Sequence, residues 1–414
     1  MNIFDNTITG NRLGGTWLLR SLFLVLVLSL PFCSLTWAQK NEITQARSLI
    51  KTGKEKELGQ AENLMVNLLK KPENRSNERI YLTWYDAVRG LYGLANERLY
   101  LKQNQDTATF FNLNLRMFTI LEALDSLDMQ PDKKGRVELE HRQKNAALLD
   151  NYRKNLFAAG TYYLRKSDYK QAFRFFEKYI DCATQPLFSG YRYDSTDVRM
   201  PEAAYWATFS AYRQQDPVLT LRHRQLALRD SSKVQYTLRY MAEARNWLHD
   251  EELYTKTLEE GFRRFPQSTY FFPRLMDAYT SDGRLDLALA ACDSALAVCD
   301  SCDVFLFAKS TTLLHLGRYT ESIEVSKRLL QFNDTMPEPY FNIGTAYVNI
   351  ALELDPLTDK QQLNKLFEQA RPYMERYRAL MPDEKKKWGP VLYRIYLNLN
   401  MGRQFDEIDR LLNK

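Results

Sequence analysis

Hydrophobic positions in the second half of the chain recur with a constant period. Counting back from Tyr347 in equal steps reaches residues that hold the same place in successive helical patterns, namely Leu313, Tyr279, Arg245 and Ala211. Around Tyr279, apolar residues precede and follow at spacings that place them on one face of a helix. The pattern therefore predicts pairs of short amphipathic helices.

Small residues mark the turn and the closest approach within each predicted pair. Gly283 and Gly317 follow Tyr279 and Leu313 by four positions, where a tight turn separates two helices. Ala288 and Ser322, nine positions after Tyr279 and Leu313, are small where the second helix must approach the first. Two outer pairs, centred on Tyr163 and Tyr396, fit the same template out of phase, with inserted residues that account for the shift.

The helix–turn–helix period of about 34 residues resembles that of the tetratricopeptide repeat (TPR) family. The segments that support the resemblance are SDYKQAFRFFEKYI (167–180), EPYFNIGTAY (338–347) and RRFPQ (263–267). The resemblance covers residues 152–414 as about seven degenerate repeats, none with the full signature. It implies an all-α, right-handed α-solenoid of helix hairpins, with an unrelated helical bundle as the alternative.

Residues 39–151 are also helical in pattern. One predicted helix has an aromatic and apolar face formed by Tyr81, Trp84, Tyr85, Val88 and Tyr92, and another opens at Asp106-Thr107. PDKKG at 131–135 is typical of a linker. We predict two or three helix pairs that cap the solenoid, because an end repeat must present one face to water.

The N-terminal segment, residues 1–38, has the pattern of a secretory signal peptide. Arg12 and Arg20 precede an apolar run over residues 22–30, and small residues up to Ala38 offer a cleavage site. The run is shorter than the roughly 20 residues of a membrane span, and no other segment is apolar enough to cross. A buried core helix is the alternative. We therefore expect an exported protein, periplasmic or otherwise associated with a bacterial cell envelope, without an integral span after signal removal.

Charge and catalytic motifs exclude several classes of function. The formal charge is +6, but basic and acidic residues are interleaved, so no segregated basic face for nucleic acid is predicted. The histidines are dispersed as His141, His223, His249 and His315, and neither a phosphate-binding glycine loop nor a nucleophile elbow is present. We therefore expect a non-enzymatic protein without a cofactor or metal.

The motif CDSC, Cys299 to Cys302, falls in a predicted turn between two repeats. A thioredoxin-type centre needs a βαβ unit and a zinc site needs four ligands, and the sequence offers neither nearby. We predict a structural disulfide among Cys292, Cys299 and Cys302, or unpaired thiols. A metal- or thiol-dependent enzyme that uses these cysteines is the alternative.

The TPR resemblance implies a binding groove lined by the first helices of successive repeats. The residues at groove-facing positions are Phe157, Thr161, Arg165, Asp277, Phe307, Thr311, His315, Phe341 and Thr345. Aromatic anchors with neighbouring hydroxyls suit an apolar or aromatic peptide. The alternative is that the phenylalanines pack as core against neighbouring repeats.

A long insertion at 186–200 is a second candidate site, because long loops in regular folds are often functional. Its candidate residues are Tyr191, Arg192, Tyr193 and Asp194, since tyrosines suit recognition. The predicted function is an exported scaffold that binds a protein or peptide partner. An envelope assembly factor or chaperone that holds unfolded clients is the alternative.

Overall fold

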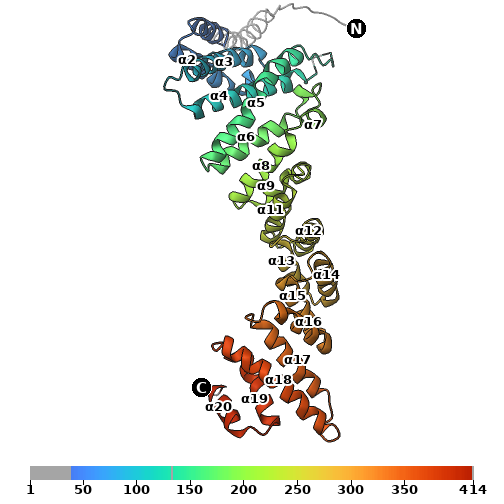
Figure 1. Cartoon of the computed structure of the whole chain (residues 1–414). Coiled ribbons are helices and arrows are strands. Elements are labelled where there is room, and N and C mark those ends of the chain that lie inside the picture. The colour runs from blue at the N-terminus through green and yellow to red at the C-terminus, as the bar shows by residue number, and fades with distance from the viewer. Residues whose placement is uncertain (1–38, 132–133, 413–414) are drawn as a thin grey trace, which may run out of the picture. The chain divides into compact units, whose positions relative to one another are not determined.

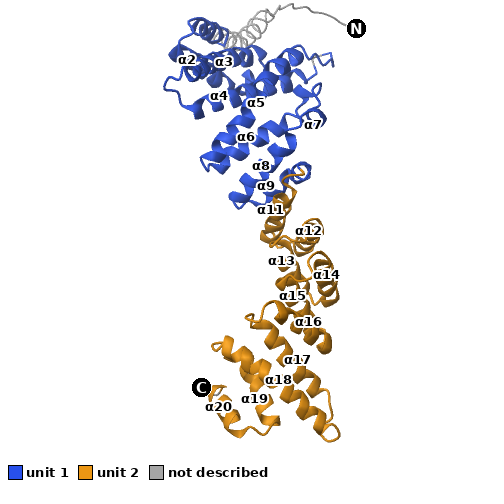
Figure 2. Ribbon diagram, in the orientation of Figure 1, with its two compact units in different colours: residues 1–230 blue, residues 231–414 orange. Residues whose placement is uncertain are grey.

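The computed structural model describes residues 39–131 and 134–412, so the predicted signal peptide lies outside the described residues. The regular secondary structure of these residues is helical throughout, as predicted (Figure 1). The chain divides into two compact units, residues 1–230 and residues 231–414 (Figure 2). None of the helices described has the length and apolar character of a membrane span.

Unit 1 is built from helix hairpins and three short helical turns. The hairpins are residues 39–51 with α2 (Glu55–Leu69), α3 (Glu78–Tyr100) with α4 (Thr107–Asp128), α5 (Arg142–Arg165) with α6 (Tyr169–Asp181), and α8 (Met200–Arg213) with α9 (Pro217–Arg222) and α10 (Arg224–Ala227). The short turns are η1 (Pro72–Asn74), η2 (Pro186–Phe188) and α7 (Tyr193–Thr196). Two hairpins precede α5 in the region of the predicted cap, and the predicted boundary at 151/152 falls inside α5.

Unit 2 continues the same architecture. Its hairpins are α11 (Val234–Trp247) with α12 (Glu251–Arg264), α13 (Phe271–Ser281) with α14 (Leu285–Val298), α15 (Asp303–His315) with α16 (Tyr319–Phe332), α17 (Glu338–Leu352) with α18 (Lys360–Leu380), and α19 (Lys385–Asn398) with α20 (Gly402–Leu412). Consecutive helices of this unit pack against each other. Counted from α5, the described residues of the whole chain form seven hairpins.

A left-handed residue ends the first helix of most hairpins. These residues have φ between 54° and 75° and are Gly53, Lys102, Ser167, Gln215, His249, Gly283, Gly317 and Asn400. Four of them, from 215 to 317, are evenly spaced, one repeat apart. At Gly283 the turn is closed by two backbone bonds, from Gly283 N to Thr280 O (3.1 Å) and from Arg284 N to Tyr279 O (2.8 Å). This pattern is the Schellman motif, and its regular recurrence gives the chain a TPR-like fold.

The residue after the left-handed position often caps the next helix. The side chains of Asp168, Asp216 and Asp250 each accept a hydrogen bond from a backbone N–H three positions ahead. An N-terminal aspartate satisfies a free N–H group and interacts favourably with the helix dipole. A left-handed residue followed by aspartate therefore ends one helix and starts the next within a single short turn.

Small residues in both helices of a hairpin are sites of close helix approach. A Cβ atom added to Gly160 would lie 2.6 Å from the Phe176 ring, so α6 crosses α5 at a point where no side chain fits. In a later hairpin, Ser322 Oγ of α16 donates to Ser310 O of α15 at 2.8 Å, and both residues are buried. The prediction that small residues allow the second helix to approach the first is confirmed.

Candidate functional site

The first helices of unit 2 present a repeated phenylalanine–threonine pair. Phe307 and Thr311 on α15 are matched one repeat later by Phe341 and Thr345 on α17. All four residues are half-buried. Because α15 and α17 are in direct contact, the two pairs lie on neighbouring helices. These four residues are called the Phe–Thr surface below.

A buried polar chain fixes the register of the helices that form this surface. Asn342, only 3% exposed, donates from Nδ2 to Ser310 Oγ (2.9 Å) and to Thr311 Oγ1 (3.0 Å). Thr311 accepts here, and its own hydroxyl hydrogen has no acceptor within the described part of the chain. Thr345 Oγ1 is buried without a hydrogen-bond partner. An unsatisfied buried hydroxyl costs about 1–3 kcal/mol, so Thr345 Oγ1 lowers stability, and the hydrogen-bonding capacity left on the surface is that of the half-buried Thr311 hydroxyl.

The predicted groove phenylalanines differ in whether their rings pack against other aromatic rings. The Phe341 ring packs on Tyr377, with centroids 5.1 Å apart, and Phe157 packs edge-on against Phe176 (5.4 Å) and Tyr179 (5.6 Å). For these two residues, packing against the following helix is part of their role. Among the described residues no aromatic ring lies against Phe307, which makes it the clearest probe of the surface.

The other predicted groove residues are distributed over both units. Thr161 donates its hydroxyl to the backbone oxygen of Phe157, at 3.1 Å, so this hydroxyl is already engaged. Arg165 on α5, Asp277 on α13 and His315 on α15 are exposed. Phe157, Thr161 and Arg165 belong to unit 1 and the remainder to unit 2.

The 186–200 insertion differs from the expected exposed recognition loop. Tyr193 is only 6% exposed, and its hydroxyl donates to Asp150 Oδ1 of α5 at 2.6 Å. Tyr191 is half-buried, with its ring 5.3 Å from that of Tyr193, whereas Arg192 and Asp194 are exposed. The insertion folds onto the hairpin because its aromatic side chains gain more by burial than by exposure to water.

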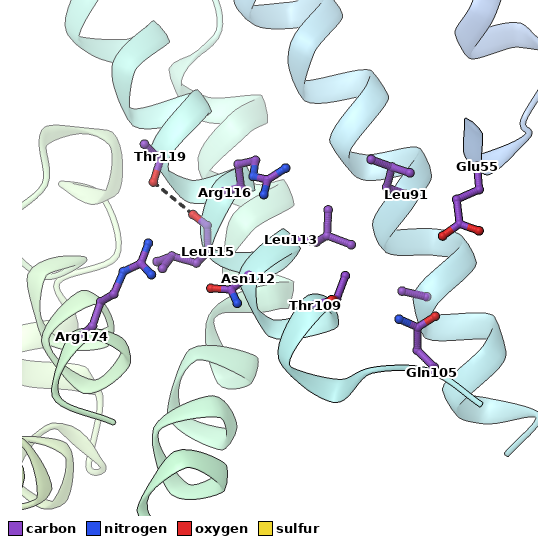
Figure 3. Close-up of a pocket in the computed structure, with 11 residues that line it drawn as sticks. Glu55, Leu91, Gln105, Thr109, Asn112, Leu113, Leu115, Arg116, Thr119 and Arg174 are labelled. Atoms are coloured by element: carbon purple, nitrogen blue, oxygen red, sulfur yellow. Dashed lines mark hydrogen bonds between the residues drawn. The ribbon is translucent and has the colours of Figure 1, made fainter. Parts of the chain in front are cut away.

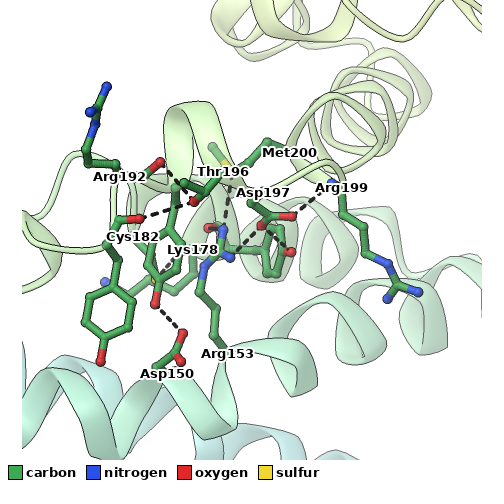
Figure 4. A network of polar contacts seen from close by, with 12 residues as sticks. Asp150, Arg153, Lys178, Cys182, Arg192, Thr196, Asp197, Arg199 and Met200 are labelled. Atoms are coloured by element: carbon green, nitrogen blue, oxygen red, sulfur yellow. Dashed lines mark hydrogen bonds and ion pairs between the residues drawn. The ribbon is translucent and has the colours of Figure 1, made fainter.

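Arg153 of α5 is the residue that holds this insertion in place. Its guanidinium lies 3.8 Å from the ring centroids of both Tyr179 and Tyr193, and its Nη1 lies 2.5 Å from Asp197 Oδ2. Figure 4 shows Asp197 turned toward Arg153, where Asp197 also accepts from the Tyr179 hydroxyl at 2.6 Å. Burial raises the pKa of both tyrosines. Sequence reasoning missed this cluster around Arg153. The available signal was the charged side chain of Arg153 on the buried face of α5, seven positions before Gly160.

A second feature that the sequence did not indicate is a hollow of about 640 Å³ in unit 1. Figure 3 shows Arg174 of α6 on one side and Glu55 of α2 on the other, with Thr109, Asn112 and Leu113 of α4 between them. Its volume is in the range of about 300–1,000 Å³ that is usual for ligand sites. It is lined mainly by second helices of the hairpins, with Leu91 and Ala95 from the first helix α3, whereas the TPR resemblance implies a groove lined by first helices.

The charges around this hollow are largely neutralised within the protein. Glu55 Oε2 lies 2.6 Å from Arg98 Nη2, and this hydrogen bond lowers the pKa of Glu55. Arg116 Nη1 lies 2.5 Å from Glu62 Oε1. Arg174, by contrast, has no carboxylate partner among the described residues and donates only to a glutamine, at 3.4 Å. The hollow therefore offers a polar lining with a single unneutralised cation among its described residues.

The four described cysteines are free thiols, which corresponds to the second of the two predicted alternatives, unpaired thiols, and not to a disulfide among Cys292, Cys299 and Cys302. Cys292 is buried on α14 with its Sγ 3.7 Å from Met276 Sδ, which shows that it packs as core. Cys299 and Cys302 are partly exposed in the turn between α14 and α15. The position of CDSC between two hairpins agrees with the prediction.

The histidines occupy separate structural positions. His141 precedes α5 with Nε2 3.7 Å from Glu78 Oε2, and His223 lies between α9 and α10, where burial lowers its pKa. His249 is a left-handed turn residue, and His315 is exposed in the last turn of α15. Among the residues that the structure describes, no three His, Cys, Asp or Glu side chains are grouped as metal ligands would be.

Comparison with models of known protein families gives no match, and comparison with curated proteins gives none either. Among solved structures, the chain is similar to the C-terminal part of a TPR repeat-containing protein from Cytophaga hutchinsonii, with 11% identity and a TM-score of 0.42 over 61% of this chain and 92% of that one. It is also similar to the TPR domain of P58(IPK), with 12% identity and a TM-score of 0.26 over 88% and 99% of the two chains.

A further similar structure is the human IFIT1 dimer with PPP-AAAA, with 14% identity and a TM-score of 0.35 over 78% of this chain and 71% of that one. All three TM-scores are below 0.5. The TPR-like fold therefore rests on the helix hairpins and the even spacing of the turns in this chain.

Proposed function

We propose that this chain is a non-enzymatic scaffold that binds an extended segment of a partner protein on the Phe–Thr surface of unit 2. The observation that supports the proposal is the repetition of the half-buried pair Phe307/Thr311 as Phe341/Thr345 on the neighbouring helix. Equivalent contacts at regular intervals suit an extended peptide, because successive repeats can engage successive residues of one strand.

The chemistry of this surface favours an apolar or aromatic segment that also has backbone groups to hydrogen-bond. A phenylalanine ring that is partly exposed gains by covering its remaining surface. A threonine hydroxyl beside it can donate to a peptide carbonyl, and the hydroxyl hydrogen of Thr311 has no acceptor in the described part of the chain. The partner is therefore proposed to be a protein, and the site of action to be the cell envelope, given the signal-peptide pattern of residues 1–38.

A display library of unstructured peptides, selected against residues 39–414, tests this function. We expect a family of peptides with spaced apolar or aromatic residues. Phe307→Ala should weaken their binding by at least tenfold, about 1.4 kcal/mol. The matched control is Leu357→Ser, because Leu357 is 91% exposed in the segment between α17 and α18. Equal affinities for Phe307→Ala and the unaltered chain would place the site elsewhere.

Two further variants separate a binding role from a structural one. Thr345→Val removes a hydroxyl that is buried without a partner, so it should preserve or raise stability and leave peptide affinity unchanged. Arg174→Glu changes the hollow of unit 1 and should leave the selected peptides bound. Selection of many unrelated, weakly bound apolar peptides would instead favour a chaperone that holds unfolded clients.

A further inference from the structure

The CDSC segment forms one tight turn between two hairpins. Cys299 follows the last residue of α14, and Cys302 directly precedes α15. Cys302 N donates to Cys299 O at 3.5 Å, which places the two cysteines at the two ends of a β-turn. The ends of such a turn have Cα atoms less than about 7 Å apart. A disulfide needs Cα atoms about 4.4–6.8 Å apart, so the Cα separation within this turn is compatible with a bridge.

The surroundings hold this turn in place without a disulfide. Arg328 Nη2 of α16 donates to the backbone oxygen of Asp300 at 2.9 Å. Asn333, just after α16, donates from Nδ2 to Asp303 Oδ2 at 2.9 Å. The far end of α16 therefore contacts both sides of the turn and holds its backbone in place in the reduced state.

The other described cysteines are in a different environment. Cys182 and Cys292 are buried, and burial raises the pKa of each thiol to about 12. Thiol–disulfide exchange requires a thiolate that the reagent can reach. Of the described cysteines, only Cys299 and Cys302 are partly exposed to solvent.

We propose that Cys299 and Cys302 form a reversible dithiol–disulfide site that reacts with low-molecular-weight disulfides. One cysteine thiolate attacks a sulfur of the reagent RSSR, forms a mixed disulfide and releases RS⁻. The second thiolate then attacks the protein sulfur of that mixed disulfide, closes the Cys299–Cys302 bond and releases a second RS⁻. The two cysteines lose two protons and two electrons, and RSSR becomes two RSH.

This site goes beyond the proposed peptide binding and does not depend on it. The bridge would tie the end of α14 to the start of α15, and would therefore add a second covalent connection, beside the backbone, between two successive hairpins. It lies at the start of the helix that presents Phe307 and Thr311. Oxidation thus fixes the N-terminal turn of a helix of the Phe–Thr surface.

The test uses residues 39–414, reduced and desalted, with oxidised glutathione as the probe. Native alkylation followed by peptide mapping should show that Cys299 and Cys302 are both alkylated before treatment and are joined to each other afterwards. Dithiothreitol should restore both thiols. Cys302→Ser should instead keep a stable glutathione adduct on Cys299. This variant retains the fold, because serine is favoured at the position before a helix.

Three results would overturn the proposal. The unaltered chain could keep both thiols alkylatable after treatment, could retain glutathione adducts on Cys299 and Cys302 without closing the bond, or could link Cys292 to one of them. A urea titration gives a second readout. Oxidation should raise the unfolding midpoint of the unaltered chain, and the midpoint of Cys302→Ser should not respond.

Discussion

The guanidinium of Arg153 and the carboxylate of Asp197 form a buried ion pair, with Nη1 and Oδ2 2.5 Å apart and the side chains 7% and 13% exposed. The pair connects α5 to the inserted segment 186–200, and the rings of Tyr179 and Tyr193 contact the guanidinium. Loss of one partner from a buried pair leaves an uncompensated charge and typically costs about 3–5 kcal/mol. We therefore expect Arg153→Met to lower the free energy of unfolding of unit 1 by about 3–5 kcal/mol, measured by urea titration.

Arg153→Lys tests whether the planar shape of the guanidinium contributes to stability in addition to its charge. Lysine cannot stack between two rings and form a planar hydrogen-bonded pair at the same time, so most of the loss should persist. The control is Arg318→Ala, which removes an exposed partner of Glu321 and should leave the midpoint almost unchanged. A small effect of Arg153→Met, similar to the control, would show that the insertion is held by its apolar contacts alone.

The Arg153–Asp197 pair also predicts that the stability of the fold depends on pH in the acid range. Burial alone would raise the pKa of Asp197, but hydrogen bonds from Tyr179 and Arg153 outweigh it and hold that pKa below its usual value. A depressed carboxyl pKa stabilises the fold fully above the unfolded pKa of about 3.9, and this stabilisation is lost as the pH falls through the folded pKa. Urea midpoints measured at decreasing pH below about 4 should therefore fall more steeply for the unaltered chain than for Asp197→Asn. Parallel curves would contradict this assignment.

Two glycines in helices predict opposite effects of the same substitution. A Cβ at Gly160 would lie 2.6 Å from Phe176, whereas a Cβ at Gly59 of α2 meets no atom within 4 Å. Gly160→Ala should destabilise unit 1 by about 1–3 kcal/mol because the core is overpacked. Gly59→Ala should stabilise it by up to about 1 kcal/mol through helix propensity. Thermal unfolding followed by circular dichroism measures both, and stabilisation by Gly160→Ala would show that α6 can move away.

The left-handed turns predict a second pair of opposite effects. Gly317 has φ 75° and Gln215 has φ 57° at the equivalent position of another hairpin. Residues with a Cβ are disfavoured there by roughly 1–2 kcal/mol. Gly317→Ala should therefore lower the free energy of unfolding by about 1 kcal/mol, and Gln215→Gly should raise it by less. Urea titration of both variants checks the signs, and a loss of stability in Gln215→Gly would show that the Gln215 side chain contributes contacts.

Sequence periodicity predicted the fold because each repeat uses the same local rules. The spacing of Tyr279 and Leu313, the glycines that follow them and the small residues in the second helices are all set within one hairpin. Such short-range patterns survive in degenerate repeats. The left-handed turns at Gln215 and His249 were not predicted, because the turn signal used in the sequence was glycine and neither position has one.

The sites were less predictable because they depend on contacts between residues that are distant in the sequence. The loop tyrosines were predicted to serve recognition from their local composition, but Tyr193 is buried against Arg153, which lies on α5 well before the insertion. The hollow of unit 1 likewise combines residues of α2, α3, α4 and α6, which are far apart in the sequence. Phe307 and Phe341 were found together because the repeat itself places equivalent residues on neighbouring helices.

The regular turns make one segment of this chain a removable module. Gly283 and Gly317 are both left-handed and one repeat apart, and each is followed by an arginine. Deletion of residues 284–317 would join Gly283 to Arg318 and recreate the same glycine–arginine turn at the junction. A chain shortened in this way would connect α13 directly to α16 through an unaltered type of turn, at the cost of one Phe–Thr pair and the CDSC turn. Length in this protein can therefore change by whole hairpins while the geometry of each junction is preserved.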